Sequence, residues 1–174
     1  MMQPVTAELD LEVSRIIKAP RDRVWNAWVD PDRLAQWWIP SPMTCRVVSL
    51  DVQPGGAFVT EMREDHGPFV PHLSACFLDV IPKERIVYTN ALTGGWRPAA
   101  NGFVTAIITL ADHPDGTHYR AQALHKSRAD REKHEELGFH DGWGTVVAQL
   151  AELVETKNQR DIESCGGTTS SFFP

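Results

Sequence analysis

The sequence predicts an α+β fold: a curved antiparallel β-sheet of about seven strands wrapped around a long C-terminal helix, with two short helices after the first strand. About a hundred residues upstream of that helix alternate apolar and polar positions between turn sequences, which is typical of strands. Near the C-terminus, apolar residues recur at helical spacing and form one stripe: Trp143, Val146, Val147, Leu150, Leu153 and Val154. Because this stripe must be covered, we expect the sheet to pack against it.

The composition is that of one domain with short ends. The chain has 174 residues, of which 42% are hydrophobic, and this is enough for a sizeable core. We expect a domain over residues 9–157, an N-terminal extension at residues 1–8 and a C-terminal tail at residues 158–174. The formal net charge of -6 and the lack of a basic run argue against a nucleic-acid partner.

The sequence also predicts a cytoplasmic protein without a membrane partner. Charged residues near the N-terminus leave no room for a signal-peptide core or a membrane span: Glu8, Asp10, Glu12, Arg15 and Lys18. The cysteines are odd in number, widely spaced and without a C-x-x-C pattern: Cys45, Cys76 and Cys165. This pattern favours a reducing compartment and thiols with a structural role.

The N-terminal part predicts one strand and two short helices. Residues 9–17 alternate apolar and polar side chains, which indicates a strand with one wet face. Pro20 begins a short helix with an apolar side. Asp30 caps a second helix over residues 32–38, and further prolines end it.

Six more strands are predicted downstream, at residues 43–50, 57–63, 72–80, 85–90, 103–111 and 117–124. Turn chemistry separates them. Pro54-Gly55 is typical of a type II turn, and residues 91–102 form a long loop rich in glycine and proline. The segment His113-Pro114-Asp115-Gly116 is the strongest hairpin signal.

The final helix is predicted over residues 127–157. Ser127 is suited to accept a hydrogen bond from the backbone N–H of Asp130, so the helix should begin there. Gly138, Gly142 and Gly144 lie in its middle, each costing about 1 kcal/mol of helix propensity relative to alanine. We interpret them as positions of close approach to the sheet, with a kink near Gly142.

Several local sequences, in this order of elements, carry a resemblance to a known family. They are Ile17-Lys18-Ala19-Pro20, Val24-Trp25, Ala27-Trp28, Asp30-Pro31, Leu34, Trp37-Trp38, Pro54-Gly55-Gly56, Phe58, Met62-Arg63, Pro82, the run 84–89, Gly142-Trp143 and Leu150. The chain resembles the START-like, or birch-pollen-allergen-like, helix-grip superfamily, also called SRPBCC. Within it, the chain is similar to bacterial homologues of the ninety-kilodalton heat-shock-protein ATPase activator. The resemblance covers residues 9–157.

The resemblance implies that a space between the sheet and the long helix holds a ligand. Strand alternation and helical spacing then predict which side chains face inward, but alternation does not decide for Phe77, Tyr88 and Ile107, whose strands are apolar on both faces. One of the adjacent Trp37 and Trp38 should lie at a rim or interface, and Trp96 should be part of a lid. The predicted ligand-binding residues are Trp38, Phe58, Met62, Phe77, Tyr88, Trp96, Ile107, Tyr119, His140, Trp143 and Val147. The alternative for each of them is ordinary core packing.

A search for catalytic groups is mostly negative. His134 and His140 are six residues apart, about 240° around a helix, so they do not form a joint metal site, and no cofactor is expected. There is no G-x-S-x-G and no glycine-rich phosphate loop. A weak case for an enzyme remains, because His140, if buried beside Tyr88 or Tyr119, would serve as an acid or base.

Three functions stay open. We favour binding of a small hydrophobic or aromatic molecule. The alternatives are an interaction module that stimulates a heat-shock chaperone ATPase and a polyketide-cyclase-like or hydratase-like enzyme. We also predict that residues 161–174 are flexible except that Phe172 and Phe173 dock on an apolar surface of their own domain or of a second copy in a homodimer, the alternative being a free tail.

Overall fold

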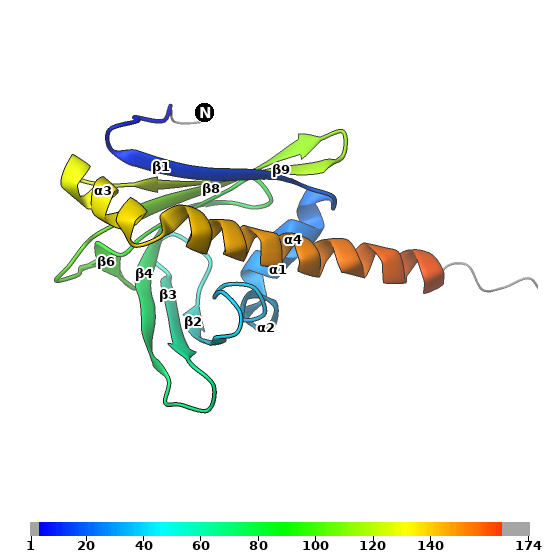
Figure 1. Ribbon diagram of the computed structural model, residues 1–174, viewed down its shortest axis with the longest axis horizontal. Helices are drawn as coiled ribbons and strands as arrows, with labels where there is room; N and C mark the ends of the chain where they lie inside the picture. The colour runs from blue at the N-terminus through cyan, green and yellow to red at the C-terminus, as the bar shows by residue number, and fades with distance from the viewer. Residues whose placement is uncertain (1–3, 165–174) are drawn as a thin grey trace, which may run out of the picture.

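The computed structural model describes residues 4–164, with side chains described through residue 156, and has an α+β architecture (Figure 1). Its main sheet has seven antiparallel strands in the order β1-β9-β8-β5-β4-β3-β2. Their bounds are β1 Asp10–Ile17, β2 Thr44–Leu50, β3 Ala57–Arg63, β4 Val70–Ile81, β5 Arg85–Thr89, β8 Thr105–His113 and β9 Gly116–Leu124. The helices are α1 Arg21–Val29, α2 Pro31–Leu34, α3 Arg128–Glu136 and α4 Phe139–Ser164.

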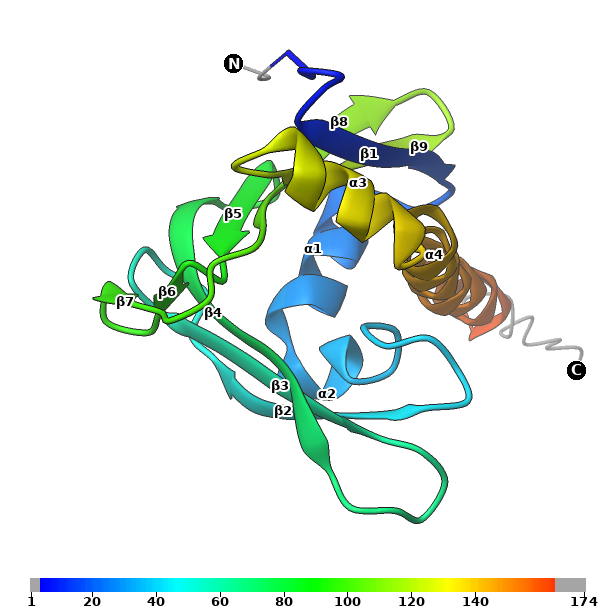
Figure 2. The same cartoon turned by 60° about the vertical axis from the view of Figure 1, so that its left-hand side comes forward.

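The sheet curves strongly and holds the helices on its concave side. Figure 2 shows α1 and α2 inside the curve, with α3 and α4 running across its open side. Apolar residues of α4 face inward: Val147, Leu150, Ala151 and Val154 are all buried. The predicted helix-grip arrangement is therefore confirmed, and α1 fills part of the concave face together with α4.

The first two helices begin where the sequence predicts and the second is shorter. The Oδ1 atom of Asp30 accepts from the backbone N–H groups of Asp32 at 2.9 Å and Arg33 at 3.4 Å, which caps α2. The helix ends at Leu34 instead of residue 38. Beyond it, Gln36 N donates to Arg33 O and Trp37 N donates to Leu34 O, each three residues back in the chain. This spacing is that of a 3₁₀ turn, so the regular α-helix ends there.

The predicted single helix over residues 127–157 is two helices with a break at Gly138. Ser127 caps α3 as expected, accepting from Asp130 N at 3.2 Å. Gly138 has φ +93°, a conformation that favours glycine and ends α3. The kink expected near Gly142 is wrong, and so is close approach, because a Cβ atom at Gly142 or Gly144 would meet nothing within 4 Å.

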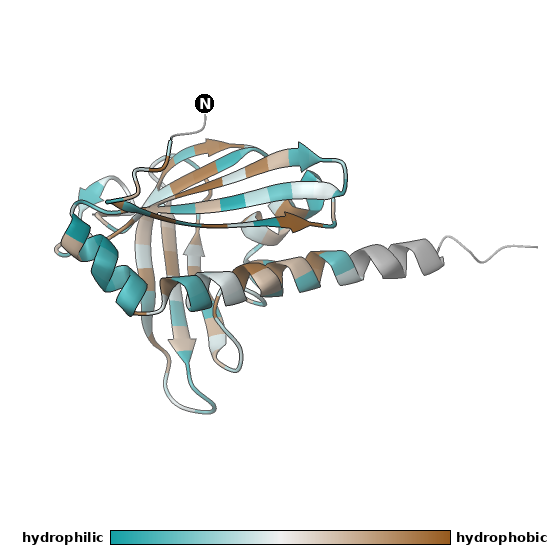
Figure 3. Ribbon diagram, turned by 45° about the horizontal axis from the view of Figure 1, so that its top comes forward, coloured by the Kyte–Doolittle hydropathy of each residue, from teal (hydrophilic) through white to brown (hydrophobic). Residues whose placement is uncertain are grey.

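The two final helices differ in their relation to the core. Helix α3 buries none of its residues, and Figure 3 shows that it is mostly hydrophilic. Helix α4 runs to Ser164, beyond the end expected at residue 157. Cys165 and the docking predicted for Phe172 and Phe173 lie outside the described residues.

The loop predicted at residues 91–102 contains a small second sheet. Strands β6, Leu92–Thr93, and β7, Arg97–Pro98, pair antiparallel there, and each is too short to leave a pattern in the sequence. The hairpin expected at residues 113–116 is confirmed, with His113 opposite Gly116. A Cβ atom on Gly116 would lie 2.2 Å from the carbonyl oxygen of Ile17, so this turn packs too closely on the end of β1 for any other residue.

Aromatic side chains form the centre of the core. The rings of Trp28, Trp37, Trp38, Phe58, Phe77 and Tyr88 make a chain of contacts with centroid separations between 5.0 and 6.5 Å. The buried Nε1 of Trp37 donates to the carbonyl oxygen of Ala27 at 2.9 Å, which fixes the corner between α1 and α2. Burial also raises the pKa of the free thiol Cys45 to about 11, in keeping with a structural role.

Candidate functional site

A cavity of about 260 Å³ lies inside the curve of the sheet, against α4. Its walls come from the corner after α2, from the inner face of the sheet, and from α3 and α4. The lining residues are Trp28, Trp37, Trp38, Pro40, His72, Leu73, Tyr88, Val104, Ile108, Tyr119, Ala121, His134, Gly142, Trp143, Val146 and Val147. Most of these side chains are aromatic or aliphatic, so the cavity is an apolar space with a few polar groups.

Two tyrosines bring hydroxyl groups to the sheet side of the cavity. Tyr119 on β9 accepts from the Nε1 of Trp28 at 3.1 Å. The hydroxyl of Tyr88 on β5 has no hydrogen-bond partner among the described residues. Burial, and next the neighbouring Tyr119, raise the pKa of Tyr88 above its usual range, and burial does the same for Tyr119 against the effect of the Trp28 hydrogen bond. Both groups are therefore neutral hydrogen-bond donors near neutral pH.

Trp38 has the only indole nitrogen of the described residues that is buried without a partner. Its Nε1 has no hydrogen-bond acceptor, while its ring lies 5.2 Å from Trp28 and 5.0 Å from Phe58. Such a donor costs about 1–3 kcal/mol in a native structure. Trp38 also lines the cavity. Its unpaired Nε1 offsets part of the stability that the packing of its ring gives to this corner of the core.

A pair of histidines forms the polar end of the cavity. His125 follows β9 and is 6% exposed, and its Nδ1 lies 2.8 Å from the carbonyl oxygen of Leu9. Its Nε2 lies 2.8 Å from Nδ1 of His134 on α3. The His134 ring is surrounded by Phe103, Phe139 and Trp143, with centroid separations of 5.2, 5.1 and 5.8 Å. Burial, and next the coulombic interaction with the neighbouring His125, lower the pKa of His134 to about 4.

The structure places five of the predicted ligand-binding residues on the cavity wall: Trp38, Tyr88, Tyr119, Trp143 and Val147. Phe58 and Phe77 are fully buried but are not among the lining residues. Their rings stack at 5.2 Å, and the ring of Phe58 packs against the lining residues Trp38 and Tyr88. These two phenylalanines therefore support the cavity without lining it.

Four other predicted residues do not reach the cavity. Met62 is half-buried on β3, and Ile107 lies on the opposite face of β8 from Ile108. Trp96 is 52% exposed at φ +62°, and a Cβ atom on Gly55 would lie 2.6 Å from its Nε1, so its indole covers a turn instead of acting as a lid. None of these three side chains is among the residues that line the cavity.

His140 is the fourth misplaced residue. Its side chain is 57% exposed and its Nε2 lies 3.4 Å from Glu135, outside the cavity. The break at Gly138 is the reason, since the helix carrying His140 starts anew at Phe139 and turns that position outward. The burial beside Tyr88 or Tyr119 on which the enzyme alternative depended is thus contradicted.

Several lining residues were not predicted, although the sequence pattern was sufficient to identify one of them, Ile108. The hairpin at residues 113–116 sets the β8–β9 register, which pairs Ile108 with Ala121. Residues two apart on a strand share a face, and so do directly opposed residues of an antiparallel pair, so the predicted inward direction of Tyr119 implies Ala121 and, through it, Ile108. His134 left no such signal, because it belongs to a polar helix and approaches its partner His125 only in three dimensions.

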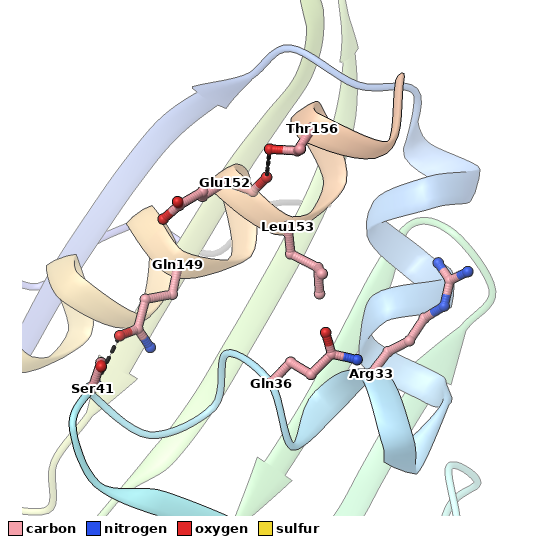
Figure 4. Close-up of a pocket in the computed structure, with 7 residues that line it drawn as sticks. All are labelled: Arg33, Gln36, Ser41, Gln149, Glu152, Leu153 and Thr156. Carbon is pink, nitrogen blue, oxygen red and sulfur yellow. Dashed lines mark hydrogen bonds between the residues drawn. The ribbon is translucent and has the colours of Figure 1, made fainter. Parts of the chain in front are cut away.

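A second, more open hollow lies outside, between α2 and α4 (Figure 4). It measures about 600 Å³ and is lined by Arg33, Gln36, Ser41, Gln149, Glu152, Leu153 and Thr156. Gln149 joins its two walls, since its Nε2 donates to the carbonyl oxygens of Trp37 and Ile39 at 3.0 Å and its Oε1 accepts from Ser41 N at 2.8 Å. These bonds give the hollow a structural role, so the inner cavity is the better site candidate.

Two absences bear on function. Among the side chains of residues 4–156, no group of three or more His, Cys, Asp or Glu is arranged to hold a metal ion. In the same part of the chain, none of the helices combines the length and the apolar character needed to cross a membrane.

Comparison with solved structures finds the same fold in other bacterial proteins. A protein from Nitrosomonas europaea is 40% identical, covers 89% of this chain and 99% of its own, and gives a TM-score of 0.80. One from Chromobacterium violaceum is 30% identical, with coverage of 84% and 98% and a TM-score of 0.67. The AHSA1-like protein from Aeromonas hydrophila, at 18% identity, coverage of 86% and 94% and a TM-score of 0.63, shares the fold.

Comparison with curated proteins finds no match. Comparison with family models gives one, described as "Activator of Hsp90 ATPase homolog 1-like protein", over residues 18–155. This span runs from the end of β1 to the last described turns of α4 and includes the whole wall of the cavity. The chain therefore belongs to the Activator of Hsp90 ATPase homolog 1-like family, in the START-like superfamily that its sequence resembles.

Proposed function

We propose that the protein binds a small apolar molecule, about the size of one or two aromatic rings, in the cavity between the sheet and α4. The observation that carries this proposal is an apolar space of about 260 Å³ with aromatic walls. Sites for drug-sized ligands measure about 300–1,000 Å³ and are mostly apolar with a few polar groups. The volume lies just below that range, which favours a compact ring system over a long acyl chain.

Native mass spectrometry of protein purified without detergent tests this proposal. We expect a species heavier than the chain, whose excess mass is lost on denaturation. The refolded protein should then bind naphthalene, with a change in tryptophan emission, because Trp28, Trp38 and Trp143 line the cavity. Protein that carries no extra mass and gives no emission change with naphthalene would contradict the proposal.

A second candidate function is stimulation of a heat-shock chaperone ATPase, which rests on the description of the family. Such a module would touch its partner with its outer surface, so a filled interior would favour it, whereas the described residues line a partly open cavity. The ATPase rate of a ninety-kilodalton heat-shock protein should rise with added protein if this candidate is right. That rise should not depend on whether the cavity is occupied.

Proton-transfer chemistry has weaker support than binding. Two histidines line the cavity: burial lowers the pKa of His72 below its usual value, and the pKa of His134 falls to about 4, far below the neutral range that suits a general base. His140, the base that the sequence suggested, is exposed. These two facts favour a site that holds its ligand over one that transforms it.

A further inference from the structure

Two imidazoles line the cavity, those of His72 and His134, and each has its Nδ1 in a hydrogen bond to a neighbouring side chain. His134 lines the cavity, and its Nδ1 is used by the hydrogen bond to His125. Its Nε2 makes no hydrogen bond to any residue between 4 and 156 and is not among the buried atoms. A polar atom of this kind in an apolar cavity is available to a ligand. Its protonation state decides whether the ligand must supply a hydrogen-bond donor or an acceptor.

The hydrogen-bond chain behind His134 fixes which nitrogen carries the proton. The carbonyl oxygen of Leu9 only accepts, so Nδ1 of His125 must donate to it at 2.8 Å. Neutral His125 then has its lone pair on Nε2, which accepts from Nδ1–H of His134 at 2.8 Å. His134 is left with a lone pair on Nε2, so this atom is a hydrogen-bond acceptor.

The surroundings keep His134 neutral, which preserves the acceptor. Its ring lies among Phe103, Phe139 and Trp143, so a positive charge there would be poorly solvated. The hydrogen-bonded neighbour of His134 is His125, which follows β9 and bears no negative charge in any protonation state, and His140 lies outside the cavity beside Glu135. None of these contacts offers His134 a carboxylate partner inside the cavity.

We propose that the ligand is a small aromatic molecule that carries a hydroxyl or N–H group, and that this group donates a hydrogen bond to Nε2 of His134. The inference rests on the proposed binding function and adds the chemical class of the ligand. A purely apolar molecule of the same shape would leave the acceptor without a hydrogen bond. Its affinity should therefore be lower than that of a ligand that donates to this atom. The tyrosine hydroxyls on the sheet side can donate as well as accept, whereas the lone pair on Nε2 of His134 only accepts and therefore requires a donor from the ligand.

A thermodynamic cycle with two probes tests the proposal on the full chain. The probes are 2-naphthol and 2-fluoronaphthalene, which are close in size but differ in the hydroxyl donor. Calorimetry gives the ratio of their affinities for the unaltered protein and for His134→Phe, which keeps a ring but removes the acceptor. We expect the ratio to favour 2-naphthol by about threefold to tenfold more in the unaltered protein, as one hydrogen bond implies.

The outcomes separate this inference from the proposed function. Equal ratios in the two proteins, with both probes binding, would overturn the inference and leave the function intact. Failure of both probes to bind the unaltered protein would overturn the function and the inference with it.

A second measurement covers the case in which His134→Phe does not fold. Nitrogen-15 spectra of the histidine rings of the unaltered protein should show one buried imidazole with an unprotonated Nε2, and its signal should move with 2-naphthol but not with 2-fluoronaphthalene. A proton on Nε2 of His134 would overturn the proposal, because that nitrogen would then be a donor.

Discussion

The indole Nε1 of Trp28 donates a hydrogen bond to the hydroxyl oxygen of Tyr119 at 3.1 Å, and both side chains are buried. This bond ties α1 to β9 at the wall of the cavity. Tyr119→Phe would leave the buried N–H of Trp28 without an acceptor. We expect the free energy of unfolding, measured in urea, to fall by about 1–3 kcal/mol.

Tyr88→Phe is the matched control for Tyr119→Phe. It removes a hydroxyl from the same cavity wall, but one that has no hydrogen-bond partner among the described residues. The free energy of unfolding should change by no more than about 0.5 kcal/mol. Equal losses in the two variants would show that the Trp28 hydrogen bond contributes nothing beyond burial.

A second prediction concerns Gln149, which holds the corner after α2 against α4. Its amide bonds three backbone groups, those of Trp37, Ile39 and Ser41. Gln149→Leu keeps the size of the side chain and removes all three bonds, so we expect the melting temperature to fall by the equivalent of about 1–3 kcal/mol. Glu152→Leu alters an exposed residue of the same hollow and should shift stability by less than about 0.5 kcal/mol.

Most of the fold was predictable because its signals are local. The seven strands of the main sheet follow alternation and turn chemistry, and Gly55 takes φ +84° as a type II turn requires. The break in the final helix was misplaced for a physical reason. Gly138, Gly142 and Gly144 have the same intrinsic freedom, and only packing of Phe139 into the core decides which of them adopts a positive φ.

The site was less predictable because its polar end depends on distant contacts. His125 forms a hydrogen bond with the carbonyl oxygen of Leu9, 116 residues away in the sequence. No local sequence pattern predicts such a contact. Strand alternation found Tyr119 but was ambiguous for β8, where Ile107 and Ile108 are equally apolar. The sequence therefore predicted the apolar wall better than the polar end of the cavity.

The histidine pair predicts a pH dependence of stability. The pKa of His134 is lowered to about 4 in the folded protein, against 6.5 as its ordinary value, so the unfolded chain binds more protons between these two pH values. Stability should thus be full above about pH 6.5 and fall as the pH drops towards about 4. In His134→Gln this part of the loss should vanish. Stability curves of the two proteins that stay parallel from pH 7 to 4 would contradict the assignment.

The last prediction uses two glycines of α4 that differ in one respect. Gly142 lines the cavity and Gly144 does not, while a Cβ atom at either position meets nothing within 4 Å. Replacing glycine inside a helix gains about 1 kcal/mol of helix propensity. We therefore expect Gly142→Leu and Gly144→Leu both to raise the melting temperature, in contrast to the destabilisation that close approach to the sheet would have caused.

Their effects on binding should diverge. The leucine side chain at position 142 starts from the cavity wall and takes up part of about 260 Å³, so Gly142→Leu should weaken naphthalene binding at least tenfold. Gly144→Leu adds the same side chain to the same helix and should leave the affinity within about twofold. Calorimetric titration of both variants decides the matter. If Gly142→Leu binds naphthalene as the unaltered protein does, the ligand lies elsewhere and the cavity is only a packing defect of the core.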